Sequence, residues 1–292
     1  MTNPPRSAHL PAEPRLLAVS DLHAAVSDNR QIVAGLRPEH PGDWLLVAGD
    51  VAECTPDIER TLTLLADRFE TVVWTPGNHE LWTHPDDPTQ LRGEHRYQHL
   101  VAICRGLGIH TPEDPYPVFR GEGGPVRVAP LFLLYDYSWV PSGFATSAEA
   151  REFAHSSGLV FTDEFLLHPD PYPTREDWCA ARVAATEQRL AEADDPELPL
   201  LLVNHYPLVR RPTDVMHHPH LAMWCGTART ADWHLRFHVA GVVYGHLHIP
   251  RRTVHDGIPF TEVSVGYPRE WRRHGHPHGI LRRVLLSPEP AI

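Results

Sequence analysis

Three short apolar runs, LLAVS (16–20), WLLVA (44–48) and TVVW (71–74), decide the fold of this chain. Apolar runs of this length, bounded by Gly, Pro and Asp, are typical of strands buried inside a sheet. The segment between the second and third runs carries apolar residues at helical spacing, at Ile58, Leu62, Leu65 and Phe69. Strands that alternate with helices in this way predict a layered α/β fold.

The strand pattern returns in the second half of the chain. Four further strands are expected, at residues 126–135, 200–203, 241–244 and 260–265. Thr174 followed by Asp177 resembles a capping box, which predicts a helix from there to about Ala193. Both halves of the chain should therefore contribute strands to the fold.

Two stretches between these strands, 81–125 and 136–173, are rich in proline and aromatic residues. We expect them to form loops beyond the ends of the strands, so that cap-like insertions lie within residues 81–199. The chain has no internal repeat and no clear linker, which predicts one domain over residues 1–292.

Five of the expected strands are followed directly by side chains that bind metal ions. Loops at the carboxyl ends of strands converge at one edge of an open α/β sheet, so these side chains should meet there. The seven candidate ligands are Asp21, His23, Asp50, Asn78, His205, His246 and His248. This mixture of carboxylate, amide and imidazole indicates iron, manganese or zinc rather than magnesium or calcium.

A chain with 22 histidines places some of them near aspartates by chance. A single histidine beside an aspartate more often caps a helix or faces solvent than binds a metal ion. The seven candidate ligands, however, all follow expected strands. The groups that follow the first three strands also lie at similar intervals along the chain. Their joint occurrence argues against coincidence.

The motifs D-x-H (21–23), GDxxE (49–53), GNHE (77–80), NHYP (204–207) and GHLH (245–248) resemble the signature of the calcineurin-like metallophosphoesterases. The resemblance implies two mixed sheets flanked by helices and a site for two metal ions. The first ion would take Asp21, His23, Asp50 and His248. The second would take Asp50, Asn78, His205 and His246, so that Asp50 bridges the pair.

Two metal ions about 3.5–4 Å apart acidify a shared water and neutralise charge on a phosphate ester. The family resemblance places His79 beside the scissile phosphate, where its imidazole could act as general acid because it titrates near working pH. Glu53 and Glu80 could orient ligands or cap helices, and we favour capping. For the two ions we expect manganese, iron or an iron–manganese pair ahead of zinc.

Several longer segments resemble the phosphopantetheinyl hydrolases of mycobacteria, a branch of that family. They are FLLYDYSWV (132–140), TDEFLLHPDPYPTREDWC (162–179), VYGHLHIPR (243–251) and EVSVGYPREWRR (262–273). The resemblance implies hydrolysis of the phosphodiester between 4′-phosphopantetheine and a carrier-protein serine. A phosphodiesterase for a small molecule such as a cyclic nucleotide is the alternative activity, and a non-catalytic scaffold of the same fold is the alternative class.

The distribution of charge suggests how a substrate protein could bind. The formal net charge of −11 argues against a nucleic-acid partner. Residues 201–292 nevertheless carry 11 Arg against 6 acidic residues. An acidic carrier protein could dock on the arginines of this region, at Arg251, Arg252, Arg269, Arg272 and Arg273.

Four residues at or next to the start of the second insertion, three aromatic and one acidic, are candidates for the wall of a channel that receives the thin pantetheine chain. They are Tyr135, Asp136, Tyr137 and Trp139. The alternative for these residues is ordinary packing of an inserted loop.

Targeting signals are missing from the sequence. No apolar run approaches the roughly 18 residues that span a membrane, and the N-terminal segment lacks the apolar core of a signal peptide. The four cysteines are scattered, without a CxxC pair. We therefore expect a cytoplasmic protein that does not bind membranes.

Overall fold

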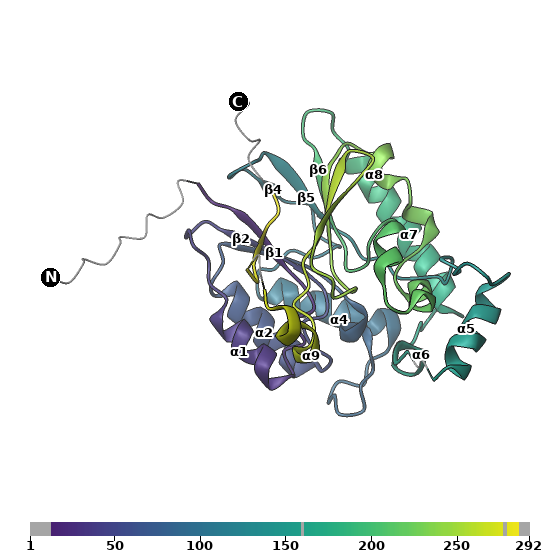
Figure 1. The fold of residues 1–292 in the computed structure, drawn as a ribbon. Helices are drawn as coiled ribbons and strands as arrows, with labels where there is room; N and C mark the ends of the chain where they lie inside the picture. The colour runs from purple at the N-terminus through teal and green to yellow at the C-terminus, as the bar shows by residue number, and fades with distance from the viewer. Residues whose placement is uncertain (1–12, 159–160, 277–278, 286–292) are drawn as a thin grey trace.

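The computed structural model describes residues 13–158, 161–276 and 279–285, whose strands form two sheets (Figure 1). The first sheet has the strand order β10-β1-β2-β3 and the second has the order β4-β5-β6-β7-β9-β8. The first sheet consists of β1 (Leu16–Val19), β2 (Trp44–Ala48), β3 (Thr71–Thr75) and β10 (Arg282–Arg283). The second consists of β4 (Val118–Phe119), β5 (Val126–Pro130), β6 (Leu200–Val203), β7 (Val239–Tyr244), β8 (Arg252–His255) and β9 (Ile258–Glu262).

Both sheets are mixed, as the family resemblance implies. Strands β1, β2 and β3 are parallel and β10 runs antiparallel to β1. In the second sheet β5, β6, β7 and β9 are parallel, and β4 and β8 are antiparallel edge strands. The prediction of a layered α/β fold is confirmed.

The two sheets pack against each other through a small apolar core. Leu46 and Val73 of the first sheet belong to the same buried cluster as Leu201, Val203 and Val243 of the second. A single bridge between Ser20 and Ser264 joins the sheets just beyond the ends of β1 and β9. The strands of the two halves are thereby aligned, with their carboxyl ends on the same side.

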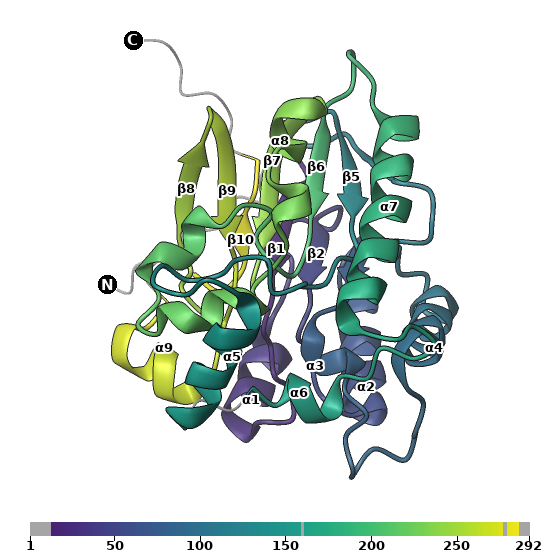
Figure 2. The ribbon, with the colours of Figure 1, turned by 90° about the vertical axis from the view of Figure 1, so that its right-hand side faces the viewer.

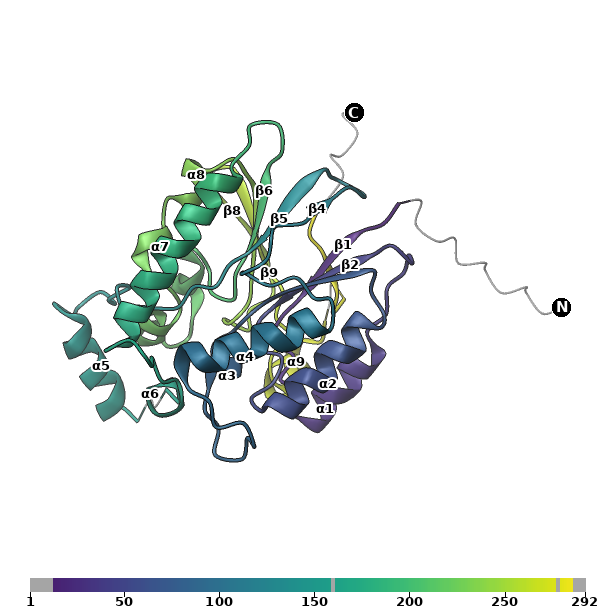
Figure 3. The same cartoon turned by 180° about the vertical axis from the view of Figure 1, so that it is seen from behind.

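Helices cover the outer faces of both sheets (Figure 3). Helices α1 and α2 lie on the side of the first sheet, and α7 and α8 lie on the side of the second. The helices are α1 (Ser27–Gly35), α2 (Thr55–Ala66), α3 (Asn78–Leu81), α4 (Gly93–Gly106), α5 (Ser147–Ser156), α6 (Asp163–Leu166), α7 (Arg175–Ala193), α8 (Trp233–Arg236) and α9 (Pro268–His274). Three short 3₁₀ helices follow β6, namely η1 (Arg211–Val215), η2 (Pro219–Trp224) and η3 (Ala228–Thr230). Within the described ranges, no helix is both long and apolar enough to cross a membrane.

The sequence located most strands but misplaced two of their ends. The strand expected at 126–135 stops at Pro130, because its partner β6 ends at Val203 and turns into the next loop. The strand expected at 260–265 is β9, which begins earlier and ends at Glu262. Beyond Glu262 the backbone pairs with Ser20 at the end of β1, which donates to the Val263 carbonyl and accepts from the Val265 N–H, so the chain leaves its partner β7 there.

The prediction that residues 81–125 form a loop beyond the strand ends is wrong. This stretch contains the 14-residue helix α4, which packs against α2. Its buried residues include Tyr97, Leu100, Val101 and Cys104, which follow helical spacing. The high proline content of the flanking residues masked this periodicity in the sequence.

The second insertion also forms helices instead of loops alone. Figure 2 shows α5 and α6 at the same end of the sheets as α9, and Figure 1 shows them on the opposite side of that end from α9. Helix α5 contacts η2, and α6 contacts α3, the short helix that begins at Asn78. The interpretation of residues 81–199 as containing cap-like insertions stays a prediction. The single-domain interpretation of residues 1–292 stays a prediction.

Candidate metal centre

Two glycines allow the strand-end loops to approach one another. A Cβ atom on Gly77 would lie 2.1 Å from Asp50 Oδ1, and one on Gly245 would lie 2.3 Å from Asp21 Oδ2. Both distances are far below van der Waals contact. The glycines of the GNHE and GHLH motifs are thus required because each lets a ligand carboxylate lie against the neighbouring loop.

Backbone strain is concentrated at the same loops. Among the described residues, seven residues other than glycine have a positive φ, and five of these are predicted ligands. The five are Asp21, His23, Asp50, His246 and His248. A left-handed conformation costs a non-glycine residue about 1–2 kcal/mol, and such strain persists where the surrounding structure enforces it, often at functional sites.

Asp21, His23 and His248 form a first cluster. Their ligand atoms all lie within 4.8 Å of one another. His248 Nε2 is 3.0 Å from Asp21 Oδ1 and 3.4 Å from His23 Nε2. The Nδ1–H groups point outward, since His23 donates to Glu53 Oε1 at 3.3 Å and His248 donates to Glu270 Oε2 at 2.7 Å. Both Nε2 atoms therefore face the same point as the Asp21 carboxylate, where their lone pairs could bind a cation.

A second cluster lies beside the first and contains Asp50, Asn78, His205 and His246. His205 donates its Nδ1–H to the Ala48 carbonyl at 2.9 Å, so its Nε2 carries a lone pair. That lone pair faces three other acceptors. His205 Nε2 is 3.1 Å from Asn78 Oδ1, 3.2 Å from His246 Nδ1 and 3.4 Å from Asp50 Oδ2.

The Asp50 carboxylate stands between the two clusters. Its Oδ2 lies 3.4 Å from His205 Nε2 in the second cluster and 4.0 Å from His23 Nε2 in the first. Acceptor atoms that converge without donors repel one another unless a cation lies among them. All seven predicted ligands are therefore brought together in an arrangement that fits two cations.

The electrostatics of the second cluster agree with this interpretation. Burial would lower the pKa of His205, but the adjacent Asp50 carboxylate raises it to about 10. Burial, and then the charge of His205, lower the pKa of His246 to about 3. The Asp50 carboxylate thus favours positive charge at His205, which is where a bound cation would supply it.

His79 lies at the rim of the two clusters. Its Nδ1–H donates to Glu53 Oε1 at 3.1 Å, and its Nε2 is 3.8 Å from Asp50 Oδ2. The side chain is 13% exposed, whereas His23 and His205 are fully buried. Although burial opposes protonation, the charges of Asp50 and Glu53 raise the pKa of His79. The imidazole can therefore hold a proton where a substrate can reach it.

The two glutamates near the site have different roles. Glu80 accepts from the backbone N–H groups of Asp50, Val51 and Gly77, which is the expected capping role extended to a neighbouring loop. Glu53 does not cap a helix. Its Oε1 accepts from both His23 and His79, so it orients two imidazoles. The capping role favoured from the sequence is wrong for Glu53.

Sequence reasoning missed three residues that support the ligands. Asp163 is fully buried, and its Oδ1 accepts from Asn78 Nδ2 at 2.9 Å and Trp82 Nε1 at 2.6 Å. This bond turns the Asn78 carbonyl oxygen toward His205. Glu270 orients His248 in the same way, and the Tyr267 ring stacks on His23 with 4.2 Å between centroids. Asp163 opens α6, whereas Tyr267 and Glu270 lie at the start of α9, and the segments that contain them, 162–179 and 262–273, were the only signal in the sequence that could have pointed to them.

Asp163→Ala should weaken metal binding by about 10–100-fold, the usual effect of losing a group that orients a ligand. The Asn78 amide would lose its acceptor and with it the fixed direction of Oδ1. Chelator competition with Mn²⁺ would measure the change. Asp163→Asn retains Oδ1 and should bind nearly as the wild type does, and the exposed Asp86→Ala serves as control. Unchanged affinity in Asp163→Ala would show that Asn78 needs no support.

The prediction that residues 135–139 line a substrate channel is wrong, and the alternative, packing within an inserted segment, describes them better. Tyr135 and Tyr137 are each 1% exposed, and they pack in an apolar cluster with Tyr206 and Trp224. The Asp136 carboxylate accepts from Thr227 and pairs with Arg229 instead of facing a channel. Trp139 is likewise buried. Ala150 and Ala154 of α5 belong to the same buried cluster as Tyr135 and Tyr137, so these two rings form part of the core.

The predicted basic residues separate into two groups. Arg269 and Arg272 are exposed on α9, next to Tyr267, and Arg272 pairs with Asp28. Arg251 instead donates to the Pro212 carbonyl at 2.7 Å and, like its neighbour Arg252, lines a different cavity.

The fold and the paired Asp/His clusters are those of a metal-dependent phosphoesterase. The sequence model of the calcineurin-like phosphoesterases matches residues 14–250, and the chain belongs to this family. It is thus a metal-dependent phosphoric ester hydrolase, as predicted, which disfavours the non-catalytic scaffold.

One characterised relative and one crystal structure show which members of the family this chain resembles. The chain is 53% identical over 280 residues to the [acyl-carrier-protein] phosphodiesterase PptH of Mycobacterium tuberculosis, covering 96% of this chain and 86% of that protein. The crystal structure of phosphopantetheinyl hydrolase (PptH) from Mycobacterium tuberculosis superposes with a TM-score of 0.92 at 53% identity, covering 96% of this chain and 99% of that one. The predicted resemblance is confirmed.

Proposed function

We propose that this protein hydrolyses the phosphodiester that joins 4′-phosphopantetheine to the serine of a carrier protein, releasing the apo carrier protein. The observation that carries the proposal is the similarity to the [acyl-carrier-protein] phosphodiesterase, at 53% identity over 96% of this chain. The similarity covers 280 residues and so extends well beyond the metal-binding loops. The complete set of seven acceptor residues with His79 beside them supports the hydrolytic chemistry.

Two metal ions would be held by the seven residues. Asp21, His23 and His248 would hold one, Asn78, His205 and His246 the other, and Asp50 would contribute to both. Imidazole-rich ligand sets favour manganese and iron over magnesium, and we propose these ahead of zinc. When bound, the ions supply an acidified water and positive charge that stabilises the phosphate transition state.

The protein's own residues perform the remaining steps. His79 holds a proton on Nε2 and donates it to the serine oxygen as that oxygen leaves the phosphorus. Glu53 keeps the ring oriented by accepting from Nδ1, and the Trp82 ring lies against the imidazole at 3.7 Å between centroids. These two contacts fix the direction in which Nε2 points.

The carrier protein would approach beside helix α9. A shallow groove of about 450 Å³, lined by Val26, Tyr267, Pro268 and Arg269, lies next to the ring that stacks on His23. Arg269 is 80% exposed and offers a positive charge to an acidic partner. Arg269 has a 3.6 Å ion pair with Glu270, Arg272 pairs with Asp28, and Arg251 donates to a backbone carbonyl, so the high exposure of Arg269 is what favours it as the docking contact. All four cysteines are free, consistent with a reducing, cytoplasmic location.

The test is incubation of the Mn²⁺-loaded protein with a holo carrier protein, followed by intact-mass spectrometry. We expect the carrier protein to lose the mass of one phosphopantetheine. The Asp50→Asn variant and an apo carrier protein serve as controls. If the holo carrier protein stays intact while a cyclic nucleotide is hydrolysed rapidly, the small-molecule phosphodiesterase is the correct alternative.

A further inference from the structure

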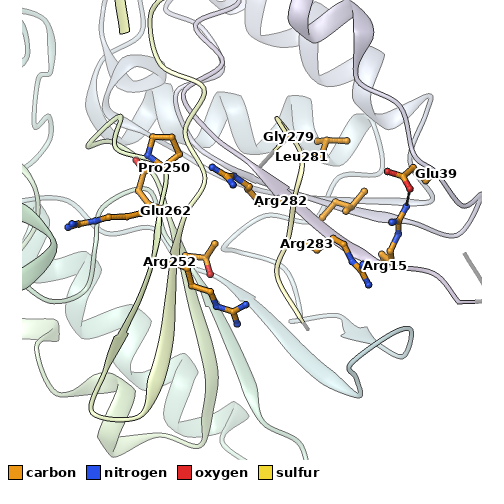
Figure 4. Close-up of a pocket in the computed structure, with 12 residues that line it drawn as sticks. Arg15, Glu39, Pro250, Arg252, Glu262, Gly279, Leu281, Arg282 and Arg283 are labelled. Carbon is orange, nitrogen blue, oxygen red and sulfur yellow. Dashed lines mark ion pairs between the residues drawn. The ribbon is translucent and has the colours of Figure 1, made fainter. Parts of the chain in front are cut away.

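A second cavity, separate from the metal centre, lies where the edges of the two sheets meet (Figure 4). Its volume is about 780 Å³. Its walls come from β1, β8, β9 and β10, from Glu39 in the loop that precedes β2, and from the turns before β8 and β10. None of its lining residues is a predicted metal ligand or His79. The volume is in the range of cavities that bind small molecules.

The cavity is strongly basic in a chain that is acidic overall. Five arginines and two glutamates line it, namely Arg15, Arg251, Arg252, Arg282, Arg283, Glu39 and Glu262. The whole chain, by contrast, has a formal net charge of −11. Glu262 is buried, and its carboxylate already accepts hydrogen bonds from the Ser264 hydroxyl and the backbone N–H of Ile249, so it is not free to pair with the cavity's arginines.

Only two of the five arginines have carboxylate partners within 4.0 Å in the part of the chain that the structure describes. Arg15 pairs with Glu39 at 2.7 Å, as Figure 4 shows, and Arg283 pairs with Glu122. Arg251 donates to a backbone carbonyl, and its Nε is buried without a hydrogen-bond partner. Arg252 and Arg282 have no ion pair within the described residues, and burial lowers the pKa of Arg282.

An anion would relieve this excess of positive charge. Guanidinium groups that share a partly enclosed space repel one another. A bound dianion attracts each of them, and this attraction offsets the repulsion. The planar fork of donors on arginine matches phosphate oxygens in pairs. Leu17, Pro250 and Leu281 add an apolar wall beside the charges. The concave shape admits a small molecule more readily than the surface of a folded protein.

We propose that this cavity binds a small molecule that carries a phosphate group, with Arg252 and Arg282 as its principal contacts. Inorganic phosphate and a phosphate ester present the same dianion, and the ester would also use the apolar wall. The site does not depend on the proposed carrier-protein reaction, since it shares no residue with the metal centre.

Isothermal titration of the metal-loaded full-length protein with phenylphosphonate tests the proposal. The carbon–phosphorus bond of this dianion resists hydrolysis, and its ring can occupy the apolar wall. Phenylphosphonate that binds at the metal centre should bind there equally in the wild type and in every variant, so it does not affect the comparison. We expect Arg252→Gln/Arg282→Gln to show one binding site fewer than the wild type, or at least about tenfold weaker binding at that site.

The control variant Arg60→Gln/Arg105→Gln removes the same charge from exposed helix positions and should bind as the wild type does. Equal binding in the wild type and Arg252→Gln/Arg282→Gln overturns the proposal. If that variant does not fold, as judged by circular dichroism, the exposed Arg252→Gln single variant gives the same comparison. A parallel titration with inorganic phosphate separates the two ligand sources: phosphate binding without phenylphosphonate binding at this site would assign it to the free anion.

Discussion

Replacing His79 by alanine should lower kcat for a carrier-protein substrate by about 10²–10⁴-fold while two metal ions stay bound, because general acid catalysis contributes on that order. The leaving serine alkoxide is strongly basic and needs the proton on Nε2. A nitrophenolate is a weak base that leaves without one. The loss in the His79→Ala variant should therefore be much smaller with bis(4-nitrophenyl) phosphate than with the holo carrier protein.

Metal content distinguishes this role from the alternative in which His79 is a ligand. The atoms of His23, Asp50 and His79 also lie within 4.8 Å of one another, so a ligand role is geometrically open. Loss of metal together with activity in His79→Ala would show that His79 binds an ion. The exposed His95→Ala variant is the matched control. Glu53→Gln, which keeps an acceptor oxygen for Nδ1 but removes the charge, should reduce kcat less than His79→Ala does.

Asp50→Asn should release at least one of the two metal ions and lower kcat by on the order of 10³-fold, since bound ions contribute several kcal/mol of transition-state stabilisation. The substitution preserves the shape of the side chain. Its Oδ1 can still accept from the backbone N–H of His79, a bond of 3.0 Å. What is lost is the negative charge at Oδ2, which faces ligands of both clusters. Inductively coupled plasma mass spectrometry would measure the metal content.

Thermal unfolding gives an independent measure of the same effect. Metal ions that bind only the folded protein raise Tm, and the rise grows with their concentration. Added Mn²⁺ should raise the Tm of Asp50→Asn less than that of the wild type. Asp57→Asn, on the exposed side of α2 where Asp57 pairs with Arg60, should respond as the wild type does. Full metal occupancy in Asp50→Asn would contradict a bridging role.

The metal-binding loops were predictable because their geometry is local. A buried strand followed by Asp50, or by His246 and His248, places those side chains at the carboxyl edge of a sheet whatever the rest of the chain does. The periodicity of residues 97–104 was equally local, but the surrounding prolines concealed α4. The ends of β5 and β9 depended on where their partner strands stopped, so the sequence placed them wrongly.

By itself, the sequence determined the α/β layering, the family and the identity of the seven acceptor residues, because each follows from short-range pattern and spacing. Only the tertiary structure decided which groups orient those residues and which aromatic rings are core. Asp163 accepts a hydrogen bond from Asn78, which lies 85 positions earlier in the sequence. Tyr135 packs in a cluster with residues of α5, and the residues next to Tyr135 in the sequence do not predict this contact. The same holds for the basic cavity, whose arginines come from both ends of the chain. Contacts of this kind depend on how distant segments pack, and that packing leaves no periodic signal in the sequence.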